Sequence, residues 1–299
     1  MIEITFLGTG SAVPTPKRNH PAVLLKFDRE MILFDCGEGT QIQFRKARIS
    51  PSKLTRLFIT HWHGDHVLGI PGLLQTLKLN DYSKTLEVYG PSGTKKYFKK
   101  IMETFVGVGK LDIKIHEVSR GKVVDEGKFQ IFAEKMDHGV SCLAYRFVEK
   151  DRLRIDKKKL GKLKIDKKDL KKLSKLAKGK DVVISGKKLK SKSMTYLEKG
   201  NVFAIALDTR VNPNLKKIAK DADVFVCEST FLTEKELAKE YGHMAVEDVV
   251  GVASAAKVGK LYLMHMSQRH ELDEKGYLTL ARKIFKNTEI ARDLMKIEI

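Results

Sequence analysis

The stretch THWHGDH at residues 60–66 places three histidines and one aspartate within six consecutive positions. It continues the apolar run 56–60, which predicts a strand, so these polar side chains fall on a strand-to-helix turn at the edge of a sheet. Imidazole and carboxylate groups are ligands suited to zinc, and Gly64 permits a tight turn that aims several short side chains at one centre. The stretch therefore predicts a metal site whose ligands two adjacent zinc ions can share.

Strand and helix signals alternate on both sides of this turn. Predicted strands occupy 2–7, 22–27, 31–34, 56–60, 86–89, 113–115, 129–134, 143–148, 202–207, 224–227 and 261–264. Predicted helices occupy 38–47, 71–79, 213–219, 234–240 and 246–256. Because strands bracket helices before and after a lysine-rich insertion, the sequence predicts an α/β sandwich that is interrupted once.

The composition sets limits on the class of protein. The chain has 299 residues, of which 42% are hydrophobic, so it can bury a full globular core and is not disordered throughout. Its apolar runs are far shorter than the roughly 20 residues that a membrane-spanning helix needs, and it does not open with a signal peptide. Cys36, Cys142 and Cys227 show no C-x-x-C spacing, which argues against a disulfide framework and a cysteine-built zinc site. We therefore expect a soluble, cytoplasmic protein without a membrane partner.

The positive charge is concentrated in one segment. Residues 150–192 carry 19 Lys and Arg residues against five Asp residues, a balance of +14, whereas the whole chain has a net charge of +20. The segment has isolated apolar residues in a lysine background and no run long enough to form its own core, so we expect a protruding arm with a short helix. Such an arm is either a solvated charged loop or a surface that attracts a polyanion. The confinement of the charge to one insertion favours contact with nucleic acid.

Three later segments continue the pattern of metal ligands: Met136-Asp137-His138, Ala206-Leu207-Asp208-Thr209 and Met264-His265-Met266. Each follows or ends a predicted strand. H-x-H-x-D-H after an apolar strand, followed in order by a lone His, an Asp and a final His, resembles the metallo-β-lactamase superfamily. The resemblance implies a four-layer αβ/βα sandwich over residues 1–299, with a dinuclear metal site at one end of two facing sheets.

Further motifs narrow the resemblance to one branch of that superfamily. The chain contains FLGTGS at 6–11, PTPKRN at 14–19, FDCGEGTQ at 34–41, GH at 242–243 and HMSQR at 265–269. Together these motifs are similar to the short form of the tRNase Z family, the transfer RNA 3′-processing endoribonucleases. The resemblance implies a homodimer that removes the 3′ trailer from precursor transfer RNA and leaves a 3′-hydroxyl. The insertion 150–192 sits where that family carries its substrate-clamping arm.

The same resemblance implies roles for individual residues. It implies two Zn²⁺ ions per chain, with Asp208 bridging a first ion held by His61, His63 and His138 and a second ion held by Asp65, His66 and His265.

Proton transfer and RNA contact are implied for a further set of residues. Asp65 is expected to accept the proton of the attacking water. His243 is expected to donate a proton to the leaving oxygen or to stabilise the charge of the pentacovalent state, with Glu228 holding the tautomer of His243. The cations expected to contact RNA are Lys17, Arg18, Arg210 and Arg269 near the cut, and Lys162, Lys164, Lys171, Lys172 and Lys175 in the insertion.

Two other classes of function share some of these features. A metal-stabilised RNA-binding protein without catalysis has no physical need for two complete ligand sets together with His243. Glyoxalase II and cyclic-nucleotide phosphodiesterases use a similar centre, but a small substrate gains little from a charge of +14 on a distant insertion. Only 57 residues separate Asp208 from His265, too few for the extra domain of the β-CASP nucleases.

Overall fold

The computed structural model describes residues 1–105, 111–161, 169–184 and 186–299, and the chain divides into two compact units. The first unit comprises Met1–Asp125, Ile131–Phe147 and Val202–Ile299. The second unit comprises Glu126–Gln130 and Val148–Asn201. The lysine-rich insertion therefore belongs to the second unit.

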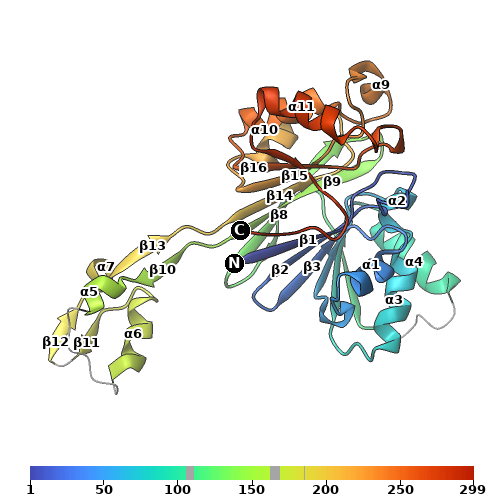
Figure 1. Cartoon of the computed structure of the whole chain (residues 1–299). Helices are drawn as coiled ribbons and strands as arrows, with labels where there is room; N and C mark the ends of the chain where they lie inside the picture. Colours follow the sequence, from blue (N-terminus) through green and yellow to red (C-terminus); the bar gives the residue numbers. More distant parts are fainter. Residues whose placement is uncertain (106–110, 162–168, 185) are drawn as a thin grey trace. The chain divides into compact units, whose positions relative to one another are not determined.

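Two β-sheets form the centre of the first unit, each with seven strands among the described residues (Figure 1). The first sheet has the order β18-β1-β2-β3-β4-β5-β6, with β1 (Ile2–Gly8), β2 (Ala22–Phe27), β3 (Glu30–Phe34), β4 (Arg56–Phe58), β5 (Leu86–Gly90), β6 (Ile113–Glu117) and β18 (Lys296–Glu298). The second has the order β17-β16-β15-β14-β9-β8-β7, with β7 (Gly121–Asp125), β8 (Phe129–Asp137), β9 (Ser141–Glu149), β14 (Val202–Ala206), β15 (Val224–Glu228), β16 (Lys260–Met264) and β17 (Thr288–Ile290).

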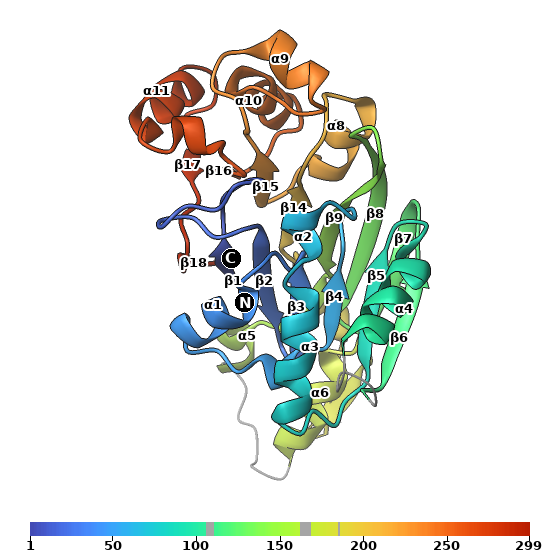
Figure 2. The same cartoon turned by 90° about the vertical axis from the view of Figure 1, so that its right-hand side faces the viewer.

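Helices cover the outer face of each sheet (Figure 2). The helices associated with the first sheet are α1 (Thr40–Lys46), α2 (Gly64–Val67), α3 (Ile70–Leu79) and α4 (Thr94–Thr104); those associated with the second are α8 (Pro213–Ala219), α9 (Lys235–Glu240), α10 (Val246–Ala255) and α11 (Glu274–Ile284). Short 3-10 helices occupy Pro51–Lys53 and Gln268–His270. In the part of the chain that the structure describes, none of the helices combines the length and apolarity that crossing a bilayer requires.

Each sheet has its own core against its helices, and aromatic rings fill the space between the two sheets. Phe34 of the first sheet lies 5.7 Å from Phe203 of the second, measured between ring centroids, and Phe58 lies 4.9 Å from Tyr145. The strands β4, β14 and β15 are buried almost throughout because both of their faces are covered. The four-layer αβ/βα sandwich predicted from the sequence is confirmed in the first unit.

The second unit differs from its prediction because it has a core of its own. Its elements are β10 (Arg152–Ile155), α5 (Lys157–Gly161), α6 (Leu170–Leu176), β11 (Val182–Ile184), β12 (Lys187–Leu189), α7 (Ser191–Met194) and β13 (Thr195–Glu198). β10 pairs with β13 and β11 pairs with β12, both antiparallel. The side chains that pack together are Leu173, Leu176, Val182, Ile184, Leu189 and Met194. Single apolar residues on several short elements can thus build a small core without any long apolar run, and the expectation that this segment has no core was wrong.

Candidate metal centre

Residues 60–66 run from the turn after β4 into the first residues of α2. β3 and β4 are parallel neighbours, so Asp35, directly after β3, lies beside Thr60. The Asp35 carboxylate accepts hydrogen bonds from the Thr60 amide and the Thr60 hydroxyl, each at 2.7 Å. This anchoring fixes the start of the turn, where His61 and His66 are fully buried.

The remaining ligand candidates follow strands of the second sheet. His138 directly follows β8, Asp208 lies two residues beyond β14, and His265 directly follows β16. Asp208 and His265 adopt left-handed backbone conformations, with φ values of 40° and 59°, and Asp35 does the same with φ of 56°. Such conformations cost free energy in residues other than glycine and cluster at functional sites. The surrounding structure therefore holds Asp35, Asp208 and His265 in place, although their backbone conformations cost free energy.

Seven side chains from both sheets meet in two groups that share Asp208. Within each group the candidate ligand atoms all lie within 4.8 Å of one another. The first group contains His61, His63, His138 and Asp208, and the second contains Asp65, His66, Asp208 and His265. The structure thus brings together all seven residues that the sequence resemblance implied as ligands.

Distances in the first group are short and similar. His63 Nδ1 lies 3.2 Å from His138 Nε2. Asp208 Oδ2 lies 3.5 Å from His138 Nε2 and 3.6 Å from His61 Nε2. Four potential ligand atoms therefore surround one point.

The second group has the same spacing. Asp65 Oδ2 lies 3.3 Å from His66 Nε2 and 3.4 Å from His265 Nε2. Asp208 Oδ2 lies 3.4 Å from His66 Nε2, while Asp208 Oδ1 lies 3.1 Å from His265 Nε2. A tetrahedral ion with bonds of about 2.0–2.1 Å requires its ligand atoms to lie about 3.3–3.4 Å apart, which is close to these distances.

Buried atoms without partners support the same interpretation. Among the described residues, His61 Nε2, His66 Nε2 and Asp208 Oδ1 are buried and make no hydrogen bond of acceptable geometry. Native structures rarely leave buried polar atoms unpaired. The orphaned atoms, their spacing and the imidazole and carboxylate donor set fit a divalent metal.

A second layer of polar groups orients four of the histidines through their other ring nitrogen. These contacts are Thr60 Oγ1 with His61 Nδ1 at 3.0 Å, Asp35 Oδ2 with His66 Nδ1 at 2.7 Å, the Gly242 carbonyl with His138 Nδ1 at 2.8 Å and Thr230 Oγ1 with His265 Nδ1 at 2.9 Å. Such partners fix the tautomer and the ring orientation of metal-binding histidines. Sequence reasoning missed these partners, although Asp35 stands in the FDCGEGTQ motif at the end of a predicted strand.

The ligand candidates shift one another's pKa values. Burial opposes a positive charge on His66, but carboxylates led by Asp208 outweigh burial and raise its pKa well above the usual range. Burial likewise opposes ionisation of Asp208, but His265 and His66 outweigh it and hold the Asp208 pKa well below its usual range. Burial, reinforced by His66, lowers the pKa of His61. The ionised Asp208 carboxylate and the neutral His61 imidazole suit a bound cation, which would take the place of the proton that the carboxylates favour on His66.

His243 and Glu228 form a pair beside the ligand groups. His243 Nδ1 lies 3.0 Å and 3.1 Å from the two carboxylate oxygens of Glu228, which is fully buried at the end of β15. Burial disfavours a charged imidazole, but Glu228 outweighs it and raises the pKa of His243 to about 9. Gly242 makes this arrangement possible, because its φ is 82° and a Cβ atom there would lie only 2.8 Å from His138 Nδ1.

The ligand groups open into a cleft of about 470 Å³. Both His243 and Arg269 line this cleft, and Arg269 is exposed with no ion pair among the described residues. Arg210 lies two residues after Asp208 in the chain, but its guanidinium donates to the Lys239 and Glu240 carbonyls and pairs with Asp137. Of the cations predicted to contact RNA near the cut, Arg269 is therefore the one with a free guanidinium in the cleft.

The other predicted cations are dispersed. Lys17 is exposed, and so are Lys171, Lys172 and Lys175 on the second unit. Lys172 pairs with Asp169 at 2.7 Å. The predicted contacts Lys162 and Lys164 lie outside the described residues.

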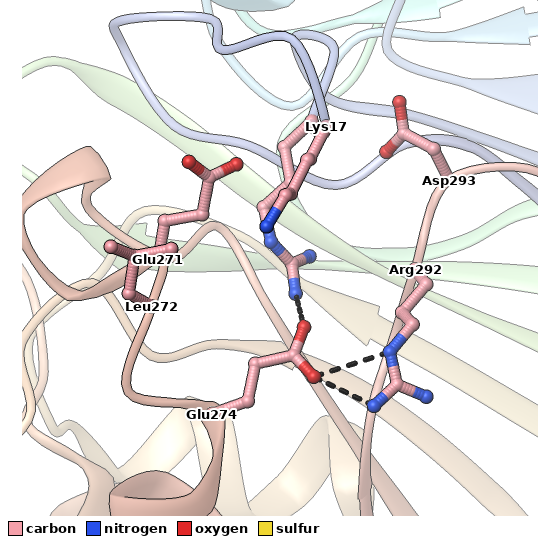
Figure 3. A pocket seen from close by; sticks show the side chains of 7 residues that line it. Lys17, Glu271, Leu272, Glu274, Arg292 and Asp293 are labelled. Atoms are coloured by element: carbon pink, nitrogen blue, oxygen red, sulfur yellow. Dashed lines mark hydrogen bonds and ion pairs between the residues drawn. The ribbon is translucent and has the colours of Figure 1, made fainter.

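Arg18, by contrast, is buried and makes several contacts within the fold. It is 3% exposed, and its guanidinium donates to Thr9 Oγ1 at 2.7 Å and to the Ala291 carbonyl at 2.8 Å. It also pairs with Glu274 at 2.6 Å, beside a pocket of about 550 Å³. Figure 3 shows Arg292 in the same pocket, where its guanidinium donates to the Glu274 carboxylate. These contacts engage the Arg18 guanidinium within the fold, and its contact with RNA stays a prediction.

We expect Arg18→Ala to destabilise the protein by about 3 kcal/mol, because it takes the Arg18 donor from Thr9 Oγ1 and the Ala291 carbonyl and leaves Glu274 with Arg292 alone. Lys17→Ala, at the adjacent exposed position, is expected to change stability by less than about 0.5 kcal/mol. Urea denaturation of both variants measures the difference. An Arg18→Ala variant that kept full stability and lost only RNA affinity would instead support the predicted RNA contact at Arg18.

Comparisons with known proteins agree with this site. A family model described as Anti-Pycsar protein Apyc1 matches residues 2–106, less than half of the chain. A ribonuclease Z of Methanothermobacter thermautotrophicus is 38% identical over 301 residues, covering 100% of this chain and 97% of that protein. A ribonuclease Z of Protochlamydia amoebophila is 36% identical and covers 98% of this chain and 95% of that protein.

A solved structure extends the likeness to three dimensions. The crystal structure of human tRNase Z, short form, is similar with a TM-score of 0.72 and 26% identity, and the match covers 99% of both chains. Full-length identity well above 30% to curated ribonuclease Z proteins, on the same fold and with two ligand groups sharing Asp208, leads to one conclusion. The chain belongs to the ribonuclease Z family.

Proposed function

We propose that the protein is a metal-dependent endoribonuclease that removes the 3′ trailer from precursor transfer RNA and leaves a 3′-hydroxyl on the transfer RNA. The observation that carries the proposal is the pair of ligand groups sharing Asp208, in one cleft with His243. Phosphodiester hydrolysis needs positive charge at the phosphate, a proton acceptor for water and a proton donor for the leaving oxygen. This cleft holds residues for each need, and membership of the ribonuclease Z family supports the choice of substrate.

We also propose that the two groups hold two Zn²⁺ ions per chain. His61, His63 and His138 would hold one ion, and Asp65, His66 and His265 the other, with Asp208 shared between them. A bound pair of such ions stabilises charge on the attacking and leaving oxygens and lowers the pKa of water to about 7.

The chain's own groups supply proton transfer. Asp65 faces the cleft beside the ligand groups, so its carboxylate lies where it can accept a proton from the attacking water. His243 also faces the cleft, with its Nδ1 held by Glu228. This orientation leaves Nε2 to donate a proton to the leaving 3′ oxygen. Glu228 therefore acts by positioning His243 and by stabilising its protonated form.

Side-by-side incubation with three substrates tests the proposal. A 3′-extended precursor transfer RNA is expected to be cut, whereas a cyclic nucleotide and a thioester are expected to react poorly. Faster hydrolysis of either small substrate would favour another hydrolase of the same fold. Tight precursor binding without cleavage by the metal-loaded protein would favour a non-catalytic RNA-binding protein.

We propose that the second unit binds the RNA backbone. Among the described residues, Lys171 and Lys175 of this unit are exposed and form no ion pair, so their charges are available to phosphates. We further propose that the protein acts in the cytoplasm as a homodimer, in accordance with the family resemblance. The molecular mass from light scattering checks the dimer directly, since one chain has a mass of 33.9 kDa.

Neutralising two lysines of the second unit is expected to change the salt dependence of precursor binding. Each phosphate contact contributes about 0.7–0.9 to the slope of log affinity against log salt concentration, so Lys171→Gln with Lys175→Gln should flatten the slope by about 1.4–1.8. The matched control is Lys283→Gln with Lys286→Gln, two exposed lysines in or next to α11 of the first unit. Equal slopes for the test and control pairs would mean that these lysines are only solvated and do not contact phosphates.

A further inference from the structure

One wall of the cleft is aromatic, and packing of the core does not explain why its outer ring is exposed. Tyr241 and Phe231 both line the cleft with the ligand groups, and their rings are stacked with centroids 6.4 Å apart and planes inclined by 24°. Tyr241 is 62% exposed, whereas Phe231 behind it is 8% exposed. An outer ring that stays in water beside a reactive centre offers a flat apolar surface to a ligand.

The aromatic wall is rigidly attached to the fold. Phe231 packs in a small buried cluster with Ala238 and Ala245. The Tyr241 amide donates to the Leu237 carbonyl at 3.1 Å, which closes the end of α9. Arg210 donates to the carbonyls of the two residues before Tyr241. The backbone that carries the ring is therefore fixed, so a stacked ligand has to order only the Tyr241 side chain.

The wall also has a defined place relative to the proton donor. The Phe231 ring centroid lies 6.3 Å from that of His243, and only Gly242 separates Tyr241 from His243 in the chain. Within the described residues the Tyr241 hydroxyl has no hydrogen-bond partner, so no polar contact explains its exposure. The wall is therefore on the His243 side of the cleft.

We infer that Tyr241, supported by Phe231, forms a subsite that stacks on the base of the nucleoside whose 3′ oxygen is the leaving group. This inference rests on the proposed function, because it places the leaving oxygen next to His243. The base joined to the same ribose is then the planar group within reach of the aromatic wall. Stacking uses the π-face that every base possesses, so the subsite takes a nucleobase of any identity at this position.

A cycle that combines protein variants with abasic substrates tests the subsite. With the unaltered protein, removal of the base on the 5′ side of the cut should lower kcat/KM by about 5- to 150-fold, the usual range for one base–aromatic stack. Tyr241→Ala should lose a similar factor on the intact precursor, and then lose little more when that base is removed. Tyr241→Phe should behave as the unaltered protein, because the ring and not the hydroxyl makes the contact.

Two controls make the cycle specific. Removal of the base on the 3′ side of the cut should cost the same factor in the unaltered protein and in Tyr241→Ala. Leu79→Ala, at an 83% exposed position at the end of α3, should not alter either abasic penalty. If Tyr241→Ala showed the full 5′ abasic penalty, or lost bound metal, the stacking role would be overturned.

The same cycle, read as the Kd of a non-cleavable precursor analogue, separates this inference from the proposed function. A protein that cuts no precursor contradicts the proposed function, whatever the binding data show. Coupling between Tyr241 and the 5′ base in Kd supports the subsite in either case. Absence of that coupling from both Kd and kcat/KM contradicts the subsite even if the precursor is cut.

Discussion

His66→Ala is expected to lower the bound metal from two ions per chain to one or none and to abolish cleavage of precursor transfer RNA. His66 is fully buried, and its Nε2 has no hydrogen-bond partner among the described residues. Its loss also leaves the buried Asp35 carboxylate without the imidazole that lies 2.7 Å away. Metal analysis after dialysis, together with a cleavage assay on the same sample, measures both effects.

Two further variants show whether the effect of His66→Ala comes from the loss of a metal ligand. Asp35→Asn keeps every candidate ligand but weakens the support of His66, so we expect metal affinity to fall by about 10- to 100-fold. His116→Ala removes a half-exposed histidine of β6 that pairs with Glu87, away from the ligand groups, and should keep both ions and full activity. A metal-free protein with full activity, or an unaltered protein that saturates at one ion, would contradict the dinuclear mechanism.

His243→Ala is expected to keep both metal ions and nearly normal affinity for the precursor, and to lose about 10²- to 10⁴-fold in turnover. The reason is that His243, in the proposed mechanism, donates a proton to the leaving oxygen, and it belongs to neither of the groups that share Asp208. A substrate with a good leaving group needs no such proton, so the same variant should cleave it with a much smaller loss. Turnover on both substrates, measured beside metal content, separates these effects.

Asp65→Ala provides the contrast. Asp65 belongs to the second ligand group and is the proposed acceptor of the water proton, so its loss should depress turnover of both substrates and lower the metal content. Equal losses of His243→Ala on the two substrates would assign His243 a purely electrostatic role. Loss of metal from that variant would instead make His243 a ligand, for which its grouping with Glu228 and His265 leaves room.

The sequence was sufficient to predict the sandwich and the elements that carry the ligands. β2 and α8 begin and end at the predicted residues, because an apolar strand and a proline-started helix are strong local signals. β8 continues three residues beyond its predicted end, to Asp137, because pairing in a sheet extends a strand through polar residues. The ligands were found through the H-x-H-x-D-H motif and the resemblance in the order of the later His and Asp residues, which lie at or just beyond the ends of such strands.

Other features escaped because they depend on contacts between distant parts of the chain. α4 has lysines around a single large buried side chain, Phe98, so its apolar period was too weak to predict a helix. Arg18 pairs with Glu274, 256 positions away, and nothing in the local pattern PTPKRN distinguishes a buried cation from an exposed one. Thr230 supports His265 only because β15 and β16 are neighbours in the sheet. Local periodicity carries no information on such pairings.

Mapping the ends of the products from a 3′-extended precursor transfer RNA, cut by the metal-loaded protein, tests the central claim most directly. We expect one cut, a transfer RNA with a 3′-hydroxyl and a trailer with a 5′-phosphate, because water attacks the phosphorus and the 3′ oxygen leaves. No cut, or a transfer RNA ending in a 2′,3′-cyclic phosphate or a 3′-phosphate, would contradict the account, because water and proton donor would then not act as this site requires.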